Sequence, residues 1–183
     1  MSALVRLSPA RRAHRAAGRR LLRGRPPRRP AAVEALDAVA VALGRGIVAG
    51  IAATAAMTIS STVEMKLRRR APSSAPADVA GKLLGVKPRR RAGDRFTTIA
   101  HLAAGTSLGT ARGLLDVAGV HGRAAPTAFF AIAWLPDLAV VPAAGAAPPP
   151  WRWSVLELAI SGAHHVAYAA AGEATYRALA SGA

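Results

Sequence analysis

The charged residues of this 183-residue chain are separated from its apolar residues along the sequence. Residues 1–30 contain ten arginines and no acid, and residues 66–95 contain ten basic side chains against two acids. The segments between and after these blocks, 31–65 and 96–183, carry one base with three acids and four bases with four acids. A soluble amphipathic helix would instead place polar residues at every third or fourth position along one face. The separation therefore predicts apolar segments within a bilayer and basic blocks outside it.

The composition excludes several classes of protein. The chain has no cysteine, so it has neither disulfides nor thiolate metal sites. Its hydrophobic share of 52% excludes disorder throughout the chain. A water-soluble bundle of alanine-rich helices is the alternative, but each helix would then expose apolar surface on every side.

Four segments are long and apolar enough to cross a bilayer, which takes about 20 residues in a helix. They run over residues 46–65, 97–120, 126–144 and 154–179. Ser154 and Glu157 have the spacing of a capping box, which marks the start of the last segment. The fold predicted is all-α, an integral membrane bundle of four transmembrane helices.

The domain organisation follows from the same pattern. A basic, disordered tail is expected over residues 1–30, and an interfacial helix over 31–45, where Glu34 and Asp37 share a face. The four-helix transmembrane domain covers residues 46–180 and includes a basic loop at 66–95.

Small residues recur at the spacing that lets helices approach closely in lipid. One row contains Gly46 and Gly50, and a second contains Gly105, Gly109 and Gly113. Gly172 occupies a similar place in the last segment. We expect these six glycines to pack helices together, either within one chain or in a homo-oligomer.

The second and fourth segments share a pattern of residues four apart. It starts at His101 and passes through the three glycines of the second row, and it starts again at His164 and passes through Tyr168, Gly172 and Tyr176. This indicates two duplicated helical hairpins, with chance as the competing explanation.

Ionisable residues within the apolar segments are candidates for function, because burying a charge in lipid is costly. Arg112 and Asp116 lie four apart and are expected to pair. Asp137 follows Pro136, and it could pair with Arg112 or His101, or take up a proton or a cation. Structural pairing is the competing interpretation in each case.

The histidines raise the question of a haem or a metal, which His101 with His164 or His165 could hold. No HxxxH or HExxH spacing is present, so we predict no cofactor and no metal, and keep this site as an alternative hypothesis.

The basic blocks indicate anionic lipid headgroups as partners. Nucleic acid is not expected, because the arginines are not interleaved with aromatic residues. Residues 1–30 also have the composition of an organellar transit peptide, or could reflect an upstream start codon. The positive-inside rule favours the cytoplasmic side for both the tail and residues 66–95, which one intervening span cannot satisfy.

The residues around Gly46–Gly50, Met57, His101–Gly109 and His164–Tyr168 resemble small, uncharacterised bacterial inner-membrane proteins of the YagU-like kind. The resemblance covers roughly residues 44–180. It implies a multi-pass protein of the cell membrane, and it transfers no catalytic residue.

The function expected is therefore non-enzymatic and depends on helix packing with a second copy, a partner or lipid. The alternative is a proton- or cation-handling transporter that uses Asp137, Arg112, Asp116 and His101.

Overall fold

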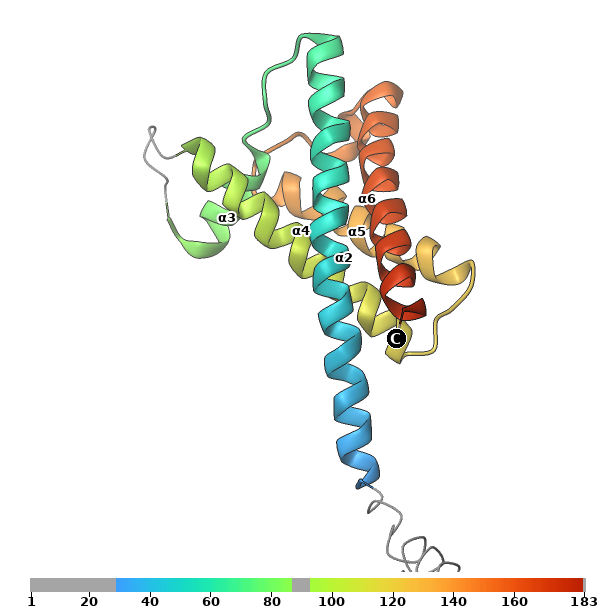
Figure 1. The fold of residues 1–183 in the computed structure, drawn as a ribbon. Helices are drawn as coiled ribbons and strands as arrows, with labels where there is room; N and C mark the ends of the chain where they lie inside the picture. The colour runs from blue at the N-terminus through green and yellow to red at the C-terminus, as the bar shows by residue number, and fades with distance from the viewer. Residues whose placement is uncertain (1–28, 87–92, 183) are drawn as a thin grey trace, which may run out of the picture. The chain divides into compact units, whose positions relative to one another are not determined.

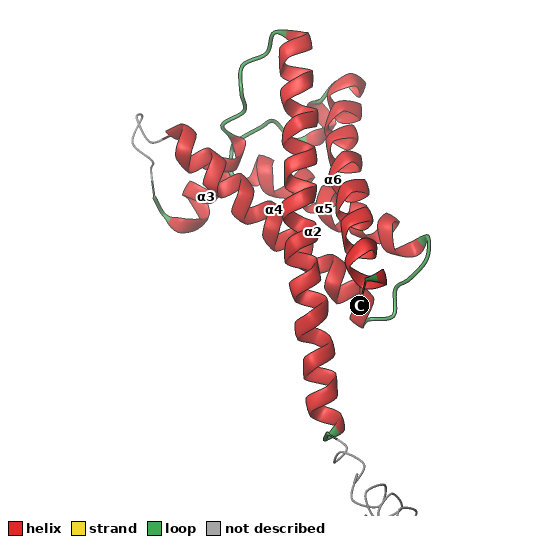
Figure 2. Ribbon diagram, viewed as in Figure 1, coloured by secondary structure: helices red, strands yellow, loops and turns green. Residues whose placement is uncertain are grey.

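The computed structural model describes residues 29–86 and 93–182, and every regular element among these residues is helical (Figure 2). The elements in chain order are α2 (Ala31–Arg68), α3 (Ala75–Leu84), α4 (Gly93–Val117), α5 (Ala124–Ala143), the 3-10 turn η2 (Pro150–Arg152) and α6 (Val155–Ser181) (Figure 1). The all-α prediction is confirmed for this part of the chain. Most of the basic tail predicted for 1–30, and residues 87–92 of the basic loop, lie outside the described residues.

The chain divides into two units, Met1–Glu34 and Ala35–Ala183, and the packing described below is that of the second unit. Helix α2 is one unbroken helix, so residues 31–45 are not a separate element from the segment that follows them. The physical reason is that 31–68 contains no proline, and its many alanines have the highest helix propensity.

The expected loop at 66–95 contains a helix, α3, that the sequence analysis did not predict. Proline lies in its first turn, and it ends at Gly85, which has the left-handed φ of 67° that favours glycine. Ala77 and Gly81 are its buried residues. A helix of ten residues within a basic segment is too short to produce a distinct apolar signal.

Helices α2 and α4 pack against each other in antiparallel directions. Residues four apart on α2 face residues four apart on α4: Ala42 contacts Gly113, Gly46 contacts Gly109, Gly50 contacts Gly105 and Gly109, and Thr58 contacts His101. Matching rows of this kind are the ridges of one helix fitting the grooves of another.

Helix α6 runs alongside α2 in the opposite direction (Figure 1), with Ser60 facing His164 and Ala53 facing Gly172. It is parallel to α4, because Tyr168 contacts Gly105 and Tyr176 contacts Asp116. It is antiparallel to α5, because Phe129 contacts Gly172 and Trp134 contacts Ser161. By their order of contacts, α4 and α6 each run opposite to α2, and α6 runs opposite to α5, although α4 and α5 cross α2 obliquely (Figure 1).

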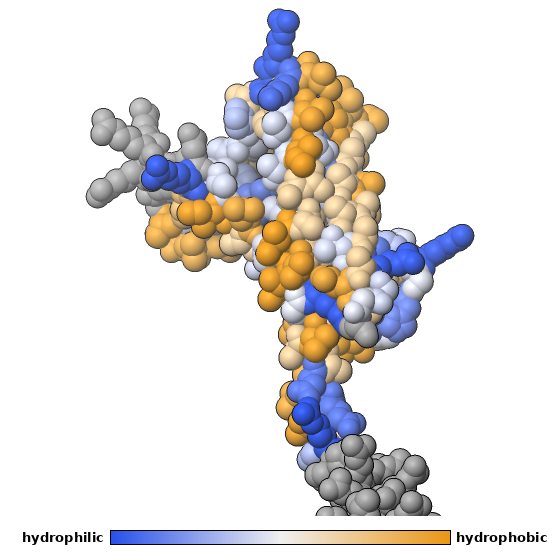
Figure 3. Space-filling view, in the orientation of Figure 1, coloured by the Kyte–Doolittle hydropathy of each residue, from blue (hydrophilic) through white to orange (hydrophobic). Residues whose placement is uncertain are grey.

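The core at the centre of these helices is small. It consists of Ala53, Phe129, Ala133, Tyr168 and Ala169, with the rings of Phe129 and Tyr168 5.5 Å apart. Most large aliphatic side chains lie instead on the outside, where apolar colour extends along α2 and charged residues gather at its C-terminal end (Figure 3).

Two of the described helices, α2 and α5, are long and apolar enough to cross a membrane. Helices α4 and α6 cover the other two predicted segments and have 25 and 27 residues, but they do not reach the same hydropathy. Histidines and charged residues within them lower the average, and these residues form the candidate site.

Candidate functional site

Two groups of polar side chains lie between the helices of the unit, and each combines buried with partly exposed members. The arginine cluster consists of Arg112, Asp116, Glu173 and Tyr176. The histidine cluster consists of Thr58, Ser60, His101, Asp137, His164 and His165. Along α4 and α6 the two clusters are separated by the contact between Gly105 and Tyr168.

Arg112 is the centre of the arginine cluster, and only 4% of its surface is exposed. Its guanidinium donates to both carboxylate oxygens of Glu173, through Nε to Oε2 and through Nη2 to Oε1 at 3.4 Å. Its Cζ lies 4.2 Å from the centre of the Tyr176 ring. A bidentate ion pair together with a cation–π contact is a geometry that arginine provides and lysine does not.

The predicted pairing of Arg112 with Asp116 is therefore only a secondary contact, with 3.9 Å between Nη1 and Oδ1. Asp116 instead accepts a hydrogen bond of 3.0 Å from the Tyr176 hydroxyl, and it lies 3.3 Å from Nδ1 of His121. Spacing along α4 could identify only the neighbour four residues away. Glu173, the principal partner, is 61 positions distant and comes close only when α4 packs on α6.

A groove of about 580 Å³ runs beside the arginine cluster, between the early part of α2 and the end of α4. Its lining is mainly alanine and valine, with Asp37, Arg45 and Asp116 as the charged members. Asp116 thus connects the buried cluster to this open groove.

Two residues of the histidine cluster bond to hydroxyls of α2. The ring nitrogen Nε2 of His101 lies 3.2 Å from the Thr58 hydroxyl, which itself donates to the Thr54 carbonyl at 2.7 Å. Because that hydroxyl hydrogen is already used, His101 must be the donor to Thr58. Nδ1 of His164 lies 2.9 Å from the Ser60 hydroxyl.

Asp137 and His165 form the third part of the histidine cluster. Nε2 of His165 is 3.8 Å from Oδ2 of Asp137, and 8% of the His165 side chain is exposed against 43% of the Asp137 side chain. His101 is the other titratable side chain near enough to interact electrostatically with Asp137. Of the partners predicted for Asp137, His101 is near, whereas Arg112 is engaged by Glu173.

The described histidines bear on the alternative hypothesis of a metal site. No group of three or more histidine, aspartate or glutamate side chains within 29–86 and 93–182 is positioned to hold a metal ion. His101 and His164 each bond a different hydroxyl of α2, through one ring nitrogen each.

The structure places the predicted glycine rows between helices of the same chain. A methyl group on Gly50 would lie 2.7 Å from the Thr106 carbonyl oxygen, and one on Gly46 would lie 2.7 Å from that of Gly109. Gly105 and Gly113 also meet atoms of α2, at Thr54 and Ala42. These five glycines are buried, so their surface is not available to a second copy.

Gly172 lies apart from those rows. A methyl group there would lie 2.7 Å from Cε1 of Phe129 and 3.2 Å from the Ala53 side chain. The two rows suggested as a duplication share their histidine contact with α2, at Thr58 and Ser60, but they differ beyond it. The duplication stays a prediction.

Glu64, near the end of α2, binds the basic residues that follow it. Its carboxylate accepts from Arg68 at 3.0 Å and from Arg70 at 2.8 Å, and this hydrogen bond raises the pKa of the Arg70 guanidinium. At the start of α6, the capping box of Ser154 and Glu157 is confirmed.

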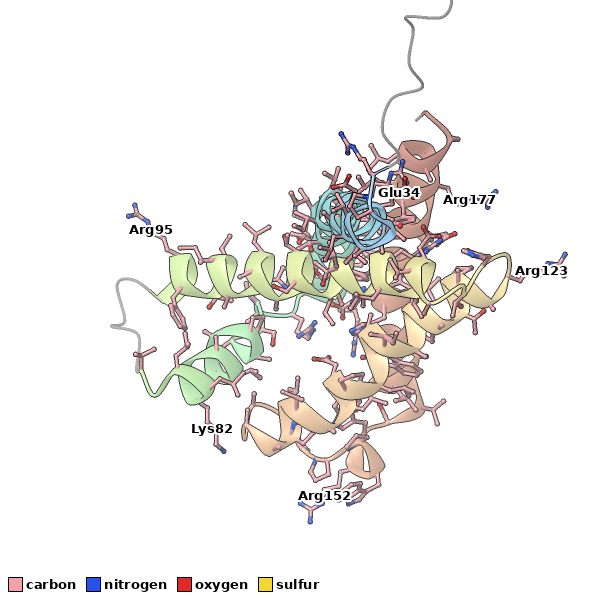
Figure 4. All side chains as sticks on the ribbon, turned by 90° about the horizontal axis from the view of Figure 1, so that it is seen from below. Glu34, Lys82, Arg95, Arg123, Arg152 and Arg177 are labelled. Carbon is pink, nitrogen blue, oxygen red and sulfur yellow. The ribbon has the colours of Figure 1, made fainter. Side chains whose placement is uncertain are left out.

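Four arginines outside the clusters point away from the helices. Arg95, Arg123, Arg152 and Arg177 all project outward in Figure 4, in contrast to the buried Arg112. Lys82 of α3 is different again, because its Nζ donates to the carbonyl of Ala143, the last residue of α5, at 2.8 Å. A cation at this place is favourable for the C-terminal end of a helix dipole.

Comparisons of the chain with protein-family models, with curated proteins and with solved structures found no match. The resemblance to YagU-like proteins stays a prediction, and the roles of the residues rest on the geometry described above.

Proposed function

We propose that the chain is a multi-pass membrane protein of four transmembrane helices, non-enzymatic, that acts through the packing of its helices with lipid or a protein partner. The bacterial inner membrane is the location that the YagU-like resemblance implies. The basic residues at the end of α2 and in the following connection would face anionic headgroups.

One observation carries this proposal: the polarity of the helical unit is inverted relative to that of a soluble bundle. Arg112 is 4% exposed, whereas Ile59 of α2 is 66% exposed. Ile47, Ile51 and Val63 of α2 and Leu135 of α5 are likewise exposed. In water this arrangement would expose large aliphatic side chains to solvent without the stabilisation that their burial provides. In lipid the aliphatic side chains contact hydrocarbon, and the charged side chains pair with each other inside the unit.

The alternation of helix direction supports four crossings in place of two. Helices α4 and α6 are long enough for a hydrocarbon core of about 30 Å at 1.5 Å per residue. Arg112 and His101 of α4 and Glu173, His164 and His165 of α6 contact neighbouring helices, which is how ionisable groups in membrane helices are accommodated, whereas Arg95 and Arg177 near the helix ends project outward. The low mean hydropathy of α4 and α6 is then a consequence of interior residues.

The proposal is tested by expressing the full chain and washing the membranes with alkaline carbonate, which removes peripheral proteins. We expect the chain to stay in the pellet and to be released only by detergent. The proposal is overturned if the purified chain remains monomeric in buffer without detergent.

A second candidate function, movement of protons or cations across the bilayer, is favoured by the partly exposed Asp137, which lies 3.8 Å from the His165 ring and interacts electrostatically with His101. Proteoliposomes that contain a pH-sensitive dye should report flux that Asp137→Asn abolishes. Flux that survives this substitution would remove Asp137 from the pathway.

A further inference from the structure

We infer that His165 and Asp137 form a site for a single proton, which the two side chains share between α6 and α5. The inference goes beyond the proposed packing function. It requires neither transport nor a particular orientation in the bilayer, because it follows from local hydrogen-bond chemistry.

The first step concerns the His165 ring. Its Nδ1 lies 2.8 Å from the carbonyl oxygen of Ser161, one turn earlier in α6. A carbonyl oxygen can only accept, so Nδ1 carries a hydrogen whether the ring is neutral or charged. The neutral ring therefore has an unprotonated Nε2.

The second step concerns the group that faces Nε2. Oδ2 of Asp137 is 3.8 Å away, and an ionised carboxylate can only accept a hydrogen bond. With a neutral ring and an ionised carboxylate, two acceptors face each other and no hydrogen bond can form between them. The separation of 3.8 Å is longer than a hydrogen bond.

One added proton removes this mismatch. On Nε2 it makes an imidazolium that donates to the carboxylate, and on Oδ2 it makes a carboxylic acid that donates to Nε2. Either form allows a charge-assisted or neutral hydrogen bond, and no second proton is needed. The pair therefore binds one proton from the medium when the pH falls and releases the same proton when the pH rises.

The surroundings favour access from the Asp137 side. The Asp137 side chain is 43% exposed within the unit, whereas the His165 side chain is 8% exposed. The other titratable groups near the pair are His101 on α4, which acts on Asp137, and the adjacent His164 on α6. Glu64 on α2 lies 4.0 Å from His164 and is bound by Arg70. Glu64 is therefore a neighbour of His164 and not of the pair of His165 and Asp137.

The test uses the full chain in detergent micelles with ¹⁵N-labelled histidine. NMR shifts of the ring nitrogens are recorded against pH, and His165→Gln identifies the signals of His165. We expect the neutral His165 ring to carry its hydrogen on Nδ1. Asp137→Asn should weaken proton binding to His165 at least about tenfold, since an opposite charge within 4–6 Å changes proton affinity by one to three orders of magnitude.

Asp116→Asn is the matched control, because it removes an acid that faces His121 in the other cluster. It should leave the His165 titration unchanged. An equal titration midpoint in the wild type and in Asp137→Asn overturns the inference. So does a neutral His165 with its hydrogen on Nε2, a result that needs no variant.

The same titration repeated in sodium, potassium and choline salts separates a proton site from a cation site. A midpoint that does not depend on the salt cation supports the inference, and displacement of the proton by sodium or potassium overturns it. If proteoliposomes show no flux, the proposed transport is excluded but the proton site is not, and the NMR titration alone decides the inference.

Discussion

At the scale of single residues, the chain keeps its interior charges by pairing them across helices. Arg112 is buried with Glu173 as a bidentate partner and Tyr176 as a π partner, while Asp116 is bound by the Tyr176 hydroxyl. A buried charge is tolerated only when its partner is present, so the members of this cluster depend on one another.

Glu173→Gln should destabilise the protein by about 3–5 kcal/mol, because it removes the principal counter-charge of the buried Arg112 and leaves only the secondary contact with Asp116 at 3.9 Å. The double variant Arg112→Met with Glu173→Gln should recover part of this loss, since no uncompensated charge remains. Unfolding of the detergent-solubilised protein, followed by circular dichroism, measures both. Arg123→Gln, which changes an outward-pointing arginine, is the control and should have little effect.

If Glu173→Gln is as stable as the wild type, the ion pair does not exist in the folded protein. The contribution of the cation–π contact can be separated with Tyr176→Leu. This variant also removes the hydroxyl that binds Asp116.

At the scale of elements, glycine decides how closely α2 and α4 approach. Main-chain atoms of the two helices touch at Gly46, Gly50 and Gly109, which leaves no room for a side chain. Contact at this distance gains dispersion energy without requiring water to be expelled, as helix association in lipid demands.

Gly50→Ala should destabilise the protein by about 1–3 kcal/mol, because the added methyl would lie 2.7 Å from the carbonyl oxygen of Thr106. Gly44→Ala, on the same helix, has no atom within 4 Å of the added methyl. It should be neutral or stabilising by at most about 1 kcal/mol through helix propensity.

Unfolding of both variants in a denaturing-detergent titration gives the comparison. Equal stability of Gly50→Ala and Gly44→Ala would mean that α2 and α4 do not pack through this row. Because the row is internal, neither variant is expected to change the oligomeric state.

At the scale of the whole molecule, the proposal of four crossings states which connections would share a side of the bilayer. The C-terminal end of α2 and the start of α6 lie at one end of the unit (Figure 1), and Lys82 of α3 bonds to the end of α5. The α4–α5 connection and the C-terminal end of α6 emerge at the other.

The absence of cysteine from the chain makes this arrangement directly testable. Single cysteines at Ser73 and Ala146 should react with a membrane-impermeant maleimide from one side of sealed vesicles. Cysteines at Ala118 and Ser181 should react only from the opposite side. Reaction of Ser73→Cys and Ser181→Cys from the same side would exclude four crossings in alternating directions.

The helical class and the positions of three of the long helices follow directly from the sequence, because hydropathy and helix propensity are local properties. The capping box at Ser154 is local in the same way, as is the glycine spacing in α2 and α4. The continuity of α2 through residues 31–45 was missed, since charge on one face suggested a separate interfacial segment where the backbone needed no break.

What only the tertiary structure decided is which polar groups meet. Asp116 is close to Arg112 in sequence, yet the main partner of Arg112 is Glu173. The packing of α4 on α6 directs the Arg112 guanidinium toward Glu173. The pairing of His165 with Asp137, and the enclosure of the glycine rows within one chain, depend on the same packing. Contacts between residues distant in sequence have no local signal, because they depend on how the helices assemble and not on the propensity of any one of them.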